Sequence, residues 1–197
     1  MGTVAARPPA LVLASGSPRR RELLARLGLP FEVRPPAAEE APRPGETPAQ
    51  TARRLAEAKA AAVMGDWVVA ADTVVEVEGR ALGKPRDAEE NERFLRLLSG
   101  RDHRVHTGLA LVGPGGAASL VSTATVRFRQ LADWEIAAYA ASGEGLDKAG
   151  GYGIQEKGMV LVEAIEGDFF TVMGLPVARL WTLLDELGYP LEGVWRA

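Results

Sequence analysis

The chain has 197 residues, of which 47% are hydrophobic and 25% are charged, and this balance predicts one domain over residues 1–197 with a sizeable core. Its formal net charge of −3 argues against nucleic acid or a membrane surface as a partner, because both require a broad positive patch. No apolar run is long enough for a membrane span or a secretory signal, and the absence of cysteine excludes disulfides and thiolate metal sites. We therefore expect a soluble, cytoplasmic protein.

The N-terminal part of the chain alternates between strand and helix patterns. Residues 10–14 are apolar and predict a short buried strand, and residues 17–28 predict a helix with Ser17 as its N-cap. A Pro-rich connection over 34–48 leads into an Ala-rich helix over 47–64, which begins with a capping box. This alternation is typical of an α/β fold.

The remaining segments mix strands and helices, which indicates that the sheet of this α/β fold is mixed. They predict a strand over 66–79, a helix over 87–98, a hairpin of strands over 103–113 and 119–130, a helix over 132–141, strands over 159–164 and 169–173, and a final helix over 176–187.

Three consecutive arginines, residues 19–21, occupy the first turn of the first predicted helix. A helix N-terminus already carries unpaired N–H groups and about half a positive charge, so three more cations are unfavourable there unless an anion binds. The planar fork of arginine matches phosphate oxygens, and we interpret the cluster as a phosphate site. A polar turn that faces water is the alternative. The chain contains no Walker loop, no G-x-G-x-x-G and no G-x-S-x-G, which argues against P-loop, Rossmann and serine-hydrolase chemistry.

Asp72 interrupts an apolar run over residues 68–75, where an isolated carboxylate is costly to bury. One interpretation is a carboxylate at the end of a strand that binds a metal ion or orients a water molecule. The other is a break in the strand, with Asp72 and Thr73 in a local turn. Glu39 and Glu40, in the Pro-rich connection, are the nearest candidates for a second metal ligand, although they also pass for ordinary loop charge.

Two lysines are candidates for phosphate contacts. Lys84 lies in a Gly-Lys-Pro turn, from which its ammonium group could reach a phosphate, but a solvated turn lysine is the more common case. Lys59 lies on the Ala-rich helix and could equally be a surface residue whose stem covers apolar neighbours.

A Gly-rich stretch over residues 143–155 contains Tyr152 and Gln155 near its end. Glycines let the backbone approach a ligand closely, and an aromatic face beside an amide suits a flat heterocycle. A flexible surface loop is the alternative. His103 and His106 have no further ligand at metal-site spacing, so we expect them to be structural.

Taken together, five ordered motifs that span nearly the whole chain resemble the Maf family of nucleoside triphosphate pyrophosphatases. The motifs are LASGSPRRRELLARLG, AADTVV, LGKP, DKAGGYGIQ and GDFFTVMGLP. The resemblance implies an enzyme that cleaves a nucleoside triphosphate between the α and β phosphates with a divalent metal such as Mg²⁺, Mn²⁺ or Co²⁺. It also implies a two-lobed α/β fold with an elongated mixed sheet and a cleft between the lobes, similar to inosine triphosphate pyrophosphatases, and a homodimer.

The same resemblance implies a role for each candidate residue. Asp72 would be the general base that activates water, and a metal ion would be held by Glu40 and Asp72. The substrate contacts would come from Ser15, Arg19, Arg20, Lys59, Thr73, Lys84 and Gln155. Branches of the family differ at three of these positions, and Arg19, Thr73 and Gln155 resemble the branch that acts on dTTP and UTP. The Gln amide can accept from N3–H and donate to O4 of uracil or thymine.

Two other classes of function remain open at this point. One is a non-catalytic protein that senses nucleotides and regulates septum formation, which the name of the family suggests. The other is a nucleotidyltransferase, which would use similar phosphate contacts but needs an acceptor site that the sequence does not indicate. Release of pyrophosphate and free monophosphate would distinguish the proposed hydrolase from both.

Overall fold

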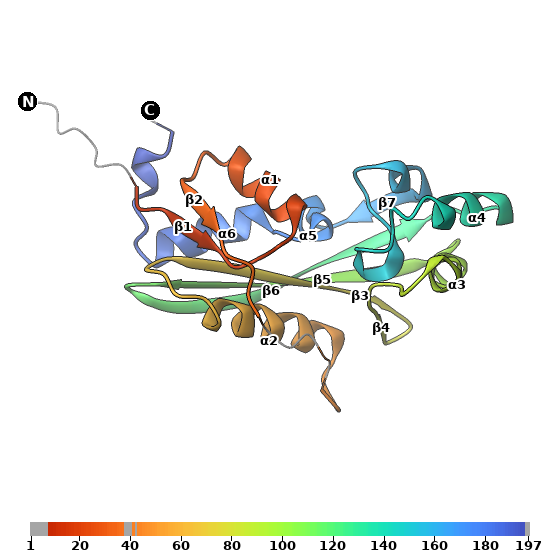
Figure 1. The fold of residues 1–197 in the computed structure, drawn as a ribbon, viewed down its shortest axis with the longest axis horizontal. Coiled ribbons are helices and arrows are strands. Elements are labelled where there is room, and N and C mark those ends of the chain that lie inside the picture. Colours follow the sequence, from red (N-terminus) through yellow and green to blue (C-terminus); the bar gives the residue numbers. More distant parts are fainter. Residues whose placement is uncertain (1–7, 38–40, 42, 196–197) are drawn as a thin grey trace, which may run out of the picture.

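The structure, a computed structural model, describes residues 8–37, 41 and 43–195. An elongated mixed sheet extends along the long axis of the molecule, and helices cover it (Figure 1). Within the described residues the strands are β1 (Leu11–Leu13), β2 (Phe31–Val33), β3 (Val68–Val77), β4 (Arg80–Leu82), β5 (Asp102–Gly113), β6 (Gly116–Phe128) and β7 (Val162–Glu166). The helices are α1 (Pro18–Arg26), α2 (Pro48–Ala61), α3 (Ala88–Leu98), α4 (Asp133–Ala141), α5 (Phe169–Met173) and α6 (Val177–Glu186), with 3-10 turns over Ala149–Gly151, Lys157–Leu161 and Leu191–Gly193.

The strand order confirms the predicted α/β fold with a mixed sheet. The strands lie in the order β2-β1-β3-β5-β6-β7, and β4 pairs with β3. Strand β1 is parallel to β2 and β3, whereas the other pairs are antiparallel. The predicted hairpin is confirmed, because β5 and β6 pair along their whole length up to Gly113 and Gly116 at the turn.

Three helices begin at residues that the sequence marks as N-caps, and two of these residues make the side-chain hydrogen bond expected of a cap. The Thr47 hydroxyl accepts from the Gln50 amide while the Gln50 side chain accepts from the Thr47 amide, which completes the predicted capping box of α2. Asp87 caps α3 by accepting from the Glu90 amide at 2.8 Å. Ser17 does occupy the N-cap position of α1, but its side chain makes no capping hydrogen bond.

Helices α1 and α6 pack on one face of the sheet and α2 on the other (Figure 1). Successive side chains of a strand point to opposite faces, so residues 69 and 71 of β3 join the core with α1 and α6, while residues 68 and 70 join the core with α2. By the same alternation, residue 72 points toward α2 and residue 73 points toward α1.

One edge of β3 is left without a strand partner over residues 70–74. Strand β1 pairs with β3 only as far as Val69, and β4 begins to pair at Val75. The interruption lies beside the carboxyl end of β1, the position at which open α/β sheets bind ligands. Side chains from both faces of β3 can therefore reach the same space.

Two predicted strands differ from the structure. Residues 169–173 form helix α5 instead of a strand, because Asp168 caps the amides of Phe170 and Thr171 and Gly174 ends the helix in a left-handed conformation. The strand predicted over 159–164 begins only at Val162, after a 3-10 turn. The short strands β2 and β4 were not predicted.

Helix α2 approaches the sheet closely at Gly108 of β5. A Cβ atom added there would lie 2.1 Å from the carbonyl oxygen of Ala52, which belongs to the helix backbone and cannot rotate away. We therefore expect Gly108→Ala to lower the free energy of unfolding by about 3 kcal/mol or more, measured by urea denaturation. Gly83→Ala is the matched control, because no atom lies within 4 Å of the added Cβ there, and it should change the value by less than about 0.5 kcal/mol. Equal stability of both variants would contradict this packing.

Candidate active site

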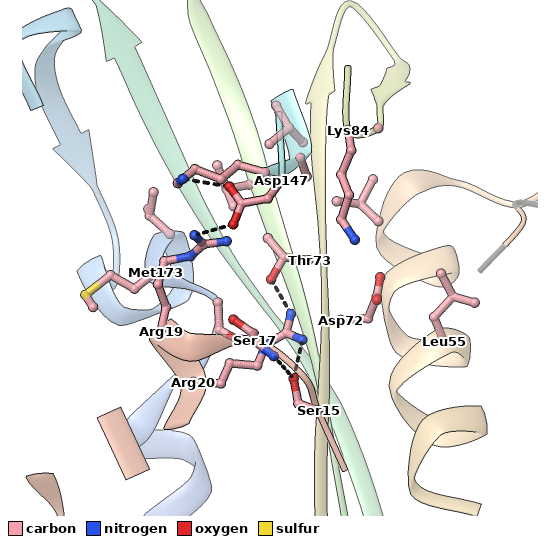
Figure 2. Close-up of a pocket in the computed structure, with 18 of the residues that line it drawn as sticks. Ser15, Ser17, Arg19, Arg20, Leu55, Asp72, Thr73, Lys84, Asp147 and Met173 are labelled. Carbon is pink, nitrogen blue, oxygen red and sulfur yellow. Dashed lines mark hydrogen bonds and ion pairs between the residues drawn. The ribbon is translucent and has the colours of Figure 1, made fainter. Parts of the chain in front are cut away.

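A cavity of about 700 Å³ lies at the interruption in the sheet edge. Most of its wall comes from residues 15–20, 72–75, 81–84, 147–149, 152–154 and 172–174, with three residues of α2. Figure 2 shows arginine, lysine and carboxylate side chains directed into it from several elements. The fold therefore gathers most of the predicted site residues, which are scattered along the chain.

Asp72 and Lys59 form a buried ion pair on the α2 side of the cavity. The Lys59 Nζ donates to Asp72 Oδ1 at 2.6 Å, and the two side chains are only 9% and 12% exposed. Both sequence interpretations of the local structure at Asp72 are wrong, because the residue lies in the middle of β3, neither at its end nor in a turn. Lys59 is likewise buried and does not lie on the surface. The pairing neutralises the carboxylate's charge and fixes its orientation, which is how a mid-strand carboxylate can be buried.

Arg20 binds to three segments at once on the other face of β3. Its Nε donates to the carbonyl oxygen of Gly174 at 2.7 Å. Its Nη1 donates to Ser15 Oγ at 3.2 Å and its Nη2 to Thr73 Oγ1 at 3.1 Å (Figure 2). Ser15 Oγ also accepts from the Ser17 amide at 3.2 Å. The guanidinium group thus joins α1, β3, the end of β1 and the end of α5.

Arg19 extends across the cavity toward the Gly-rich stretch. Its Nη1 lies 3.4 Å from Asp147 Oδ2, and Lys148 Nζ donates to Asp147 Oδ1 at 2.7 Å. Burial raises the pKa of Asp147, but the hydrogen bond from Lys148 and the charges of Lys148 and Arg19 outweigh it, so the net pKa is lowered. Asp147 and Lys148 were not predicted as site residues, although a charged pair inside a Gly-rich stretch was the available signal.

Lys84 enters the cavity from the loop after β4. This loop is tied to the Gly-rich stretch, because the Gly83 carbonyl oxygen accepts from the Gly150 amide at 3.0 Å. Lys84 and Gly83 both line the cavity, and Figure 2 shows the lysine side chain directed into it. The predicted turn lysine is thus placed where it can contact an anion.

Two predicted site residues are not placed in the cavity wall. Among the described residues Gln155 is not one of those that line the cavity, and Glu40 lies outside the described residues. Tyr152 does line the cavity, but its ring also packs edge-on against Phe128 in the core. Tyr152 and Gln155 therefore do not by themselves show where a flat heterocycle would bind.

The described carboxylates around the cavity can supply part of a metal site but do not form a complete one. In the part of the chain that the structure describes, no three acidic, histidine or cysteine residues lie close enough together to hold a metal ion. Lys59 occupies Oδ1 of Asp72, which leaves Oδ2 as the oxygen that can bind a metal ion or a water molecule.

Both histidines have structural partners. His103 Nε2 lies 2.7 Å from the Tyr152 hydroxyl, and His106 lies between Glu76 and Thr123 at 2.7 and 2.9 Å. These contacts agree with the expectation that both histidines are structural. No helix within residues 8–37 and 43–195 has the length and apolarity that a membrane span requires.

Comparison with known proteins connects this geometry to a family. A family model described as Maf-like protein matches residues 10–187. A dTTP/UTP pyrophosphatase of Thermus thermophilus is 55% identical over 181 residues, which cover 92% of this chain and 96% of that protein. A dTTP/UTP pyrophosphatase of Deinococcus radiodurans is 49% identical over 94% of this chain and 97% of that protein. Among solved structures, the Ham1 protein of Staphylococcus aureus aligns with 64% of this chain and 73% of its own, at 21% identity and a TM-score of 0.44.

The buried His103 predicts a pH dependence of stability. Burial lowers the pKa of this imidazole from 6.5 to about 4, against a small opposing effect of Asp102. Between these values the unfolded chain binds a proton that the folded protein does not, so stability falls as the pH falls. The contribution of His103 to this loss should reach about 3 kcal/mol at pH 4.

Thermal or urea unfolding of the wild type and His103→Gln between pH 7 and pH 4 measures this difference. The amide of the variant can either donate to or accept from the Tyr152 hydroxyl, and carboxylates that titrate in this range do so in both proteins. The variant should lose less stability on acidification. Parallel pH profiles would show that His103 titrates normally in the folded protein.

Proposed function

The chain belongs to the Maf family, and from this premise we propose that it hydrolyses dTTP and UTP to the monophosphate and pyrophosphate. The observation that carries the proposal is the convergence of a carboxylate, Asp72, with several cations in one cavity of a chain whose relatives are named dTTP/UTP pyrophosphatases. A cavity of about 700 Å³ is also in the size range of small-molecule sites. The two-lobed single domain inferred for residues 1–197 would place this cavity between its lobes.

The triphosphate binds, in this proposal, at the N-terminus of α1. The first turn of α1 supplies backbone N–H groups, and Arg19 and Arg20 add cationic donors beside them. Lys84 lies on another wall of the same cavity and provides a further positive charge. Attack by water on a polyanion is opposed mainly by charge, so these groups would contribute chiefly by neutralising and positioning the phosphates.

Asp72 is the proposed general base. Its carboxylate lines the cavity, and its pairing with Lys59 leaves one oxygen to take a proton from water. Loss of that proton assists the addition of water across the α–β anhydride, with pyrophosphate as the leaving group. Lys59 would hold the carboxylate in position, and because its ammonium group has three protons it could also donate to a phosphate oxygen.

A divalent metal ion also belongs to the proposal. Asp72 and Glu40 are the residues that would hold it, and when bound it would neutralise charge on the phosphates. Arg19, Thr73 and Gln155 would discriminate between bases. Thr73 and Arg19 line the cavity, whereas Gln155 would need to act from beyond the wall that the structure describes.

Pyrophosphate release from a panel of nucleoside triphosphates tests the function. Canonical and methylated triphosphates are incubated with Mg²⁺, Mn²⁺ or Co²⁺, and we expect metal-dependent release with the highest kcat/KM for dTTP and UTP. Turnover of methylated guanine nucleotides alone would overturn the substrate assignment. Nucleotide binding without any turnover would instead favour the non-catalytic regulator.

Asp72→Asn is the catalytic control for this experiment. The variant keeps an oxygen that accepts from Lys59, so it should fold, but it lacks the base and should lose about 10²–10⁴-fold in kcat. Circular dichroism and unfolding curves establish that the variant is folded. Wild-type turnover by the folded variant would remove Asp72 from the mechanism.

Two neighbouring arginines provide a matched test of phosphate binding. Arg19 lines the cavity, whereas Arg21 is exposed on α1 and is not among the lining residues. We expect Arg19→Ala to raise KM for UTP by about 10–100-fold, the value of a charge-assisted hydrogen bond, and Arg21→Ala to change it less than about twofold. Steady-state kinetics on both variants measures the difference. Equal effects would mean that the arginines act only through the general positive charge of the helix end.

A further inference from the structure

A chain of hydroxyl groups runs from the cavity into the core beneath it. Thr73 of β3 and Thr107 of β5 are directly paired across the two strands, and their Oγ1 atoms lie 2.9 Å apart. Thr107 Oγ1 lies 2.7 Å from the carbonyl oxygen of Thr171 in α5. At the cavity end, Arg20 Nη2 lies 3.1 Å from Thr73 Oγ1. Thr107 has no exposed surface, so it cannot itself contact a ligand.

The position of each proton in this chain follows from what each group can donate. A carbonyl oxygen only accepts, so the single hydroxyl proton of Thr107 lies on the short contact with Thr171. Thr107 therefore has no proton left for Thr73 and must accept from it at 2.9 Å. Arginine only donates, so the contact between Arg20 and Thr73 uses a lone pair of the Thr73 oxygen.

This assignment makes Thr73 an acceptor toward the cavity. Its one proton is directed into the core, one lone pair binds Arg20, and the second lone pair is what remains for a ligand. Thr73 lines the cavity on the face of β3 that also holds Arg20. A ligand group that contacts Thr73 must therefore donate a hydrogen bond.

An acceptor of this kind can distinguish only between ligand groups that always donate and ligand groups that always accept a hydrogen bond. A sugar hydroxyl can either donate or accept and would satisfy Thr73 in both cases, and phosphate oxygens at neutral pH have no proton to give. The ring nitrogen N3 of a pyrimidine is different, because it carries a proton in uracil and thymine and a lone pair in cytosine. Uracil and thymine can therefore donate to Thr73 at N3, and cytosine cannot.

We propose that Thr107 is a positioning residue that holds Thr73 as a hydrogen-bond acceptor and thereby favours uracil and thymine nucleotides over cytosine nucleotides. This inference rests on the proposed pyrophosphatase function and adds to it the basis of base selection. Thr107 acts entirely through Thr73. Thr107 can hold Thr73 as an acceptor only while its own hydroxyl donates to the Thr171 carbonyl oxygen. The role of Thr73 therefore depends on a contact between β5 and α5.

Replacement of Thr107 by Val tests the proposal, because Val has nearly the same shape but no hydroxyl group. The Thr73 proton then loses its acceptor and can turn toward the cavity, where it can donate to N3 of cytosine. We expect Thr107→Val to reduce the ratio of kcat/KM for UTP to that for CTP by about tenfold, measured as pyrophosphate release from each substrate.

Three further variants separate this role from a structural one. Thr107→Ser retains the hydroxyl group and should restore the wild-type ratio. Thr123→Val removes a sheet hydroxyl that bonds to His106 instead of Thr73, and it should leave the ratio unchanged. Thr73→Val should also reduce the ratio, and adding Thr107→Val to it should cause no further change, because Thr107 would have lost the group through which it acts.

The outcomes distinguish failure of this inference from failure of the proposed function. If the wild type releases no pyrophosphate from any triphosphate, the proposed function fails. If the wild type is active but folded Thr107→Val keeps its UTP to CTP ratio, the positioning role is wrong while the hydrolase remains. If Thr107→Val and Thr107→Ser reduce the ratio equally, the effect comes from packing and the hydroxyl relay is rejected.

Discussion

A carboxylate in the middle of a buried strand requires a cation beside it, and the pairing of Asp72 with Lys59 meets this requirement. The pair forms only because α2 lies directly against the sheet, and Gly108 permits that contact at the level of the backbone. The orientation of the proposed base thus depends on helix packing as much as on its own strand. A shift of α2 away from the sheet would separate these two buried charges from each other.

The interruption in the sheet edge explains how residues on opposite faces of β3 serve one cavity. Asp72 points toward α2 and Thr73 toward α1, yet both reach the space between the end of β1 and the start of β4. The carboxylate and its lysine lie on one side of the strand, and Arg20 with its three hydrogen bonds lies on the other. Strand alternation thereby places the proposed water-activating group on one face of β3 and the contact between Arg20 and Thr73 on the other.

Local signals in the sequence predicted much of the fold, and long-range contacts explain most of what they missed. The caps at Thr47 and Asp87 and the β5–β6 hairpin were predictable because neighbouring residues determine them. Residues 169–173 look like a strand by composition, and only the caps at both ends favour the helix. The partner of Asp72 lies on another element, so its burial as an ion pair could not be read from the strand itself. Nothing in the local sequence distinguishes Thr107 from any other strand threonine.

The hydrogen bond between Arg20 and the Gly174 carbonyl joins residues that are 154 positions apart. Such a contact gives no stabilisation until a long loop has closed, which costs conformational entropy. During synthesis, the segment that ends α5 emerges from the ribosome long after α1, so the arginine site is incomplete on the growing chain. A nascent chain would therefore have little affinity for the abundant nucleotides around it until almost the whole protein has been made.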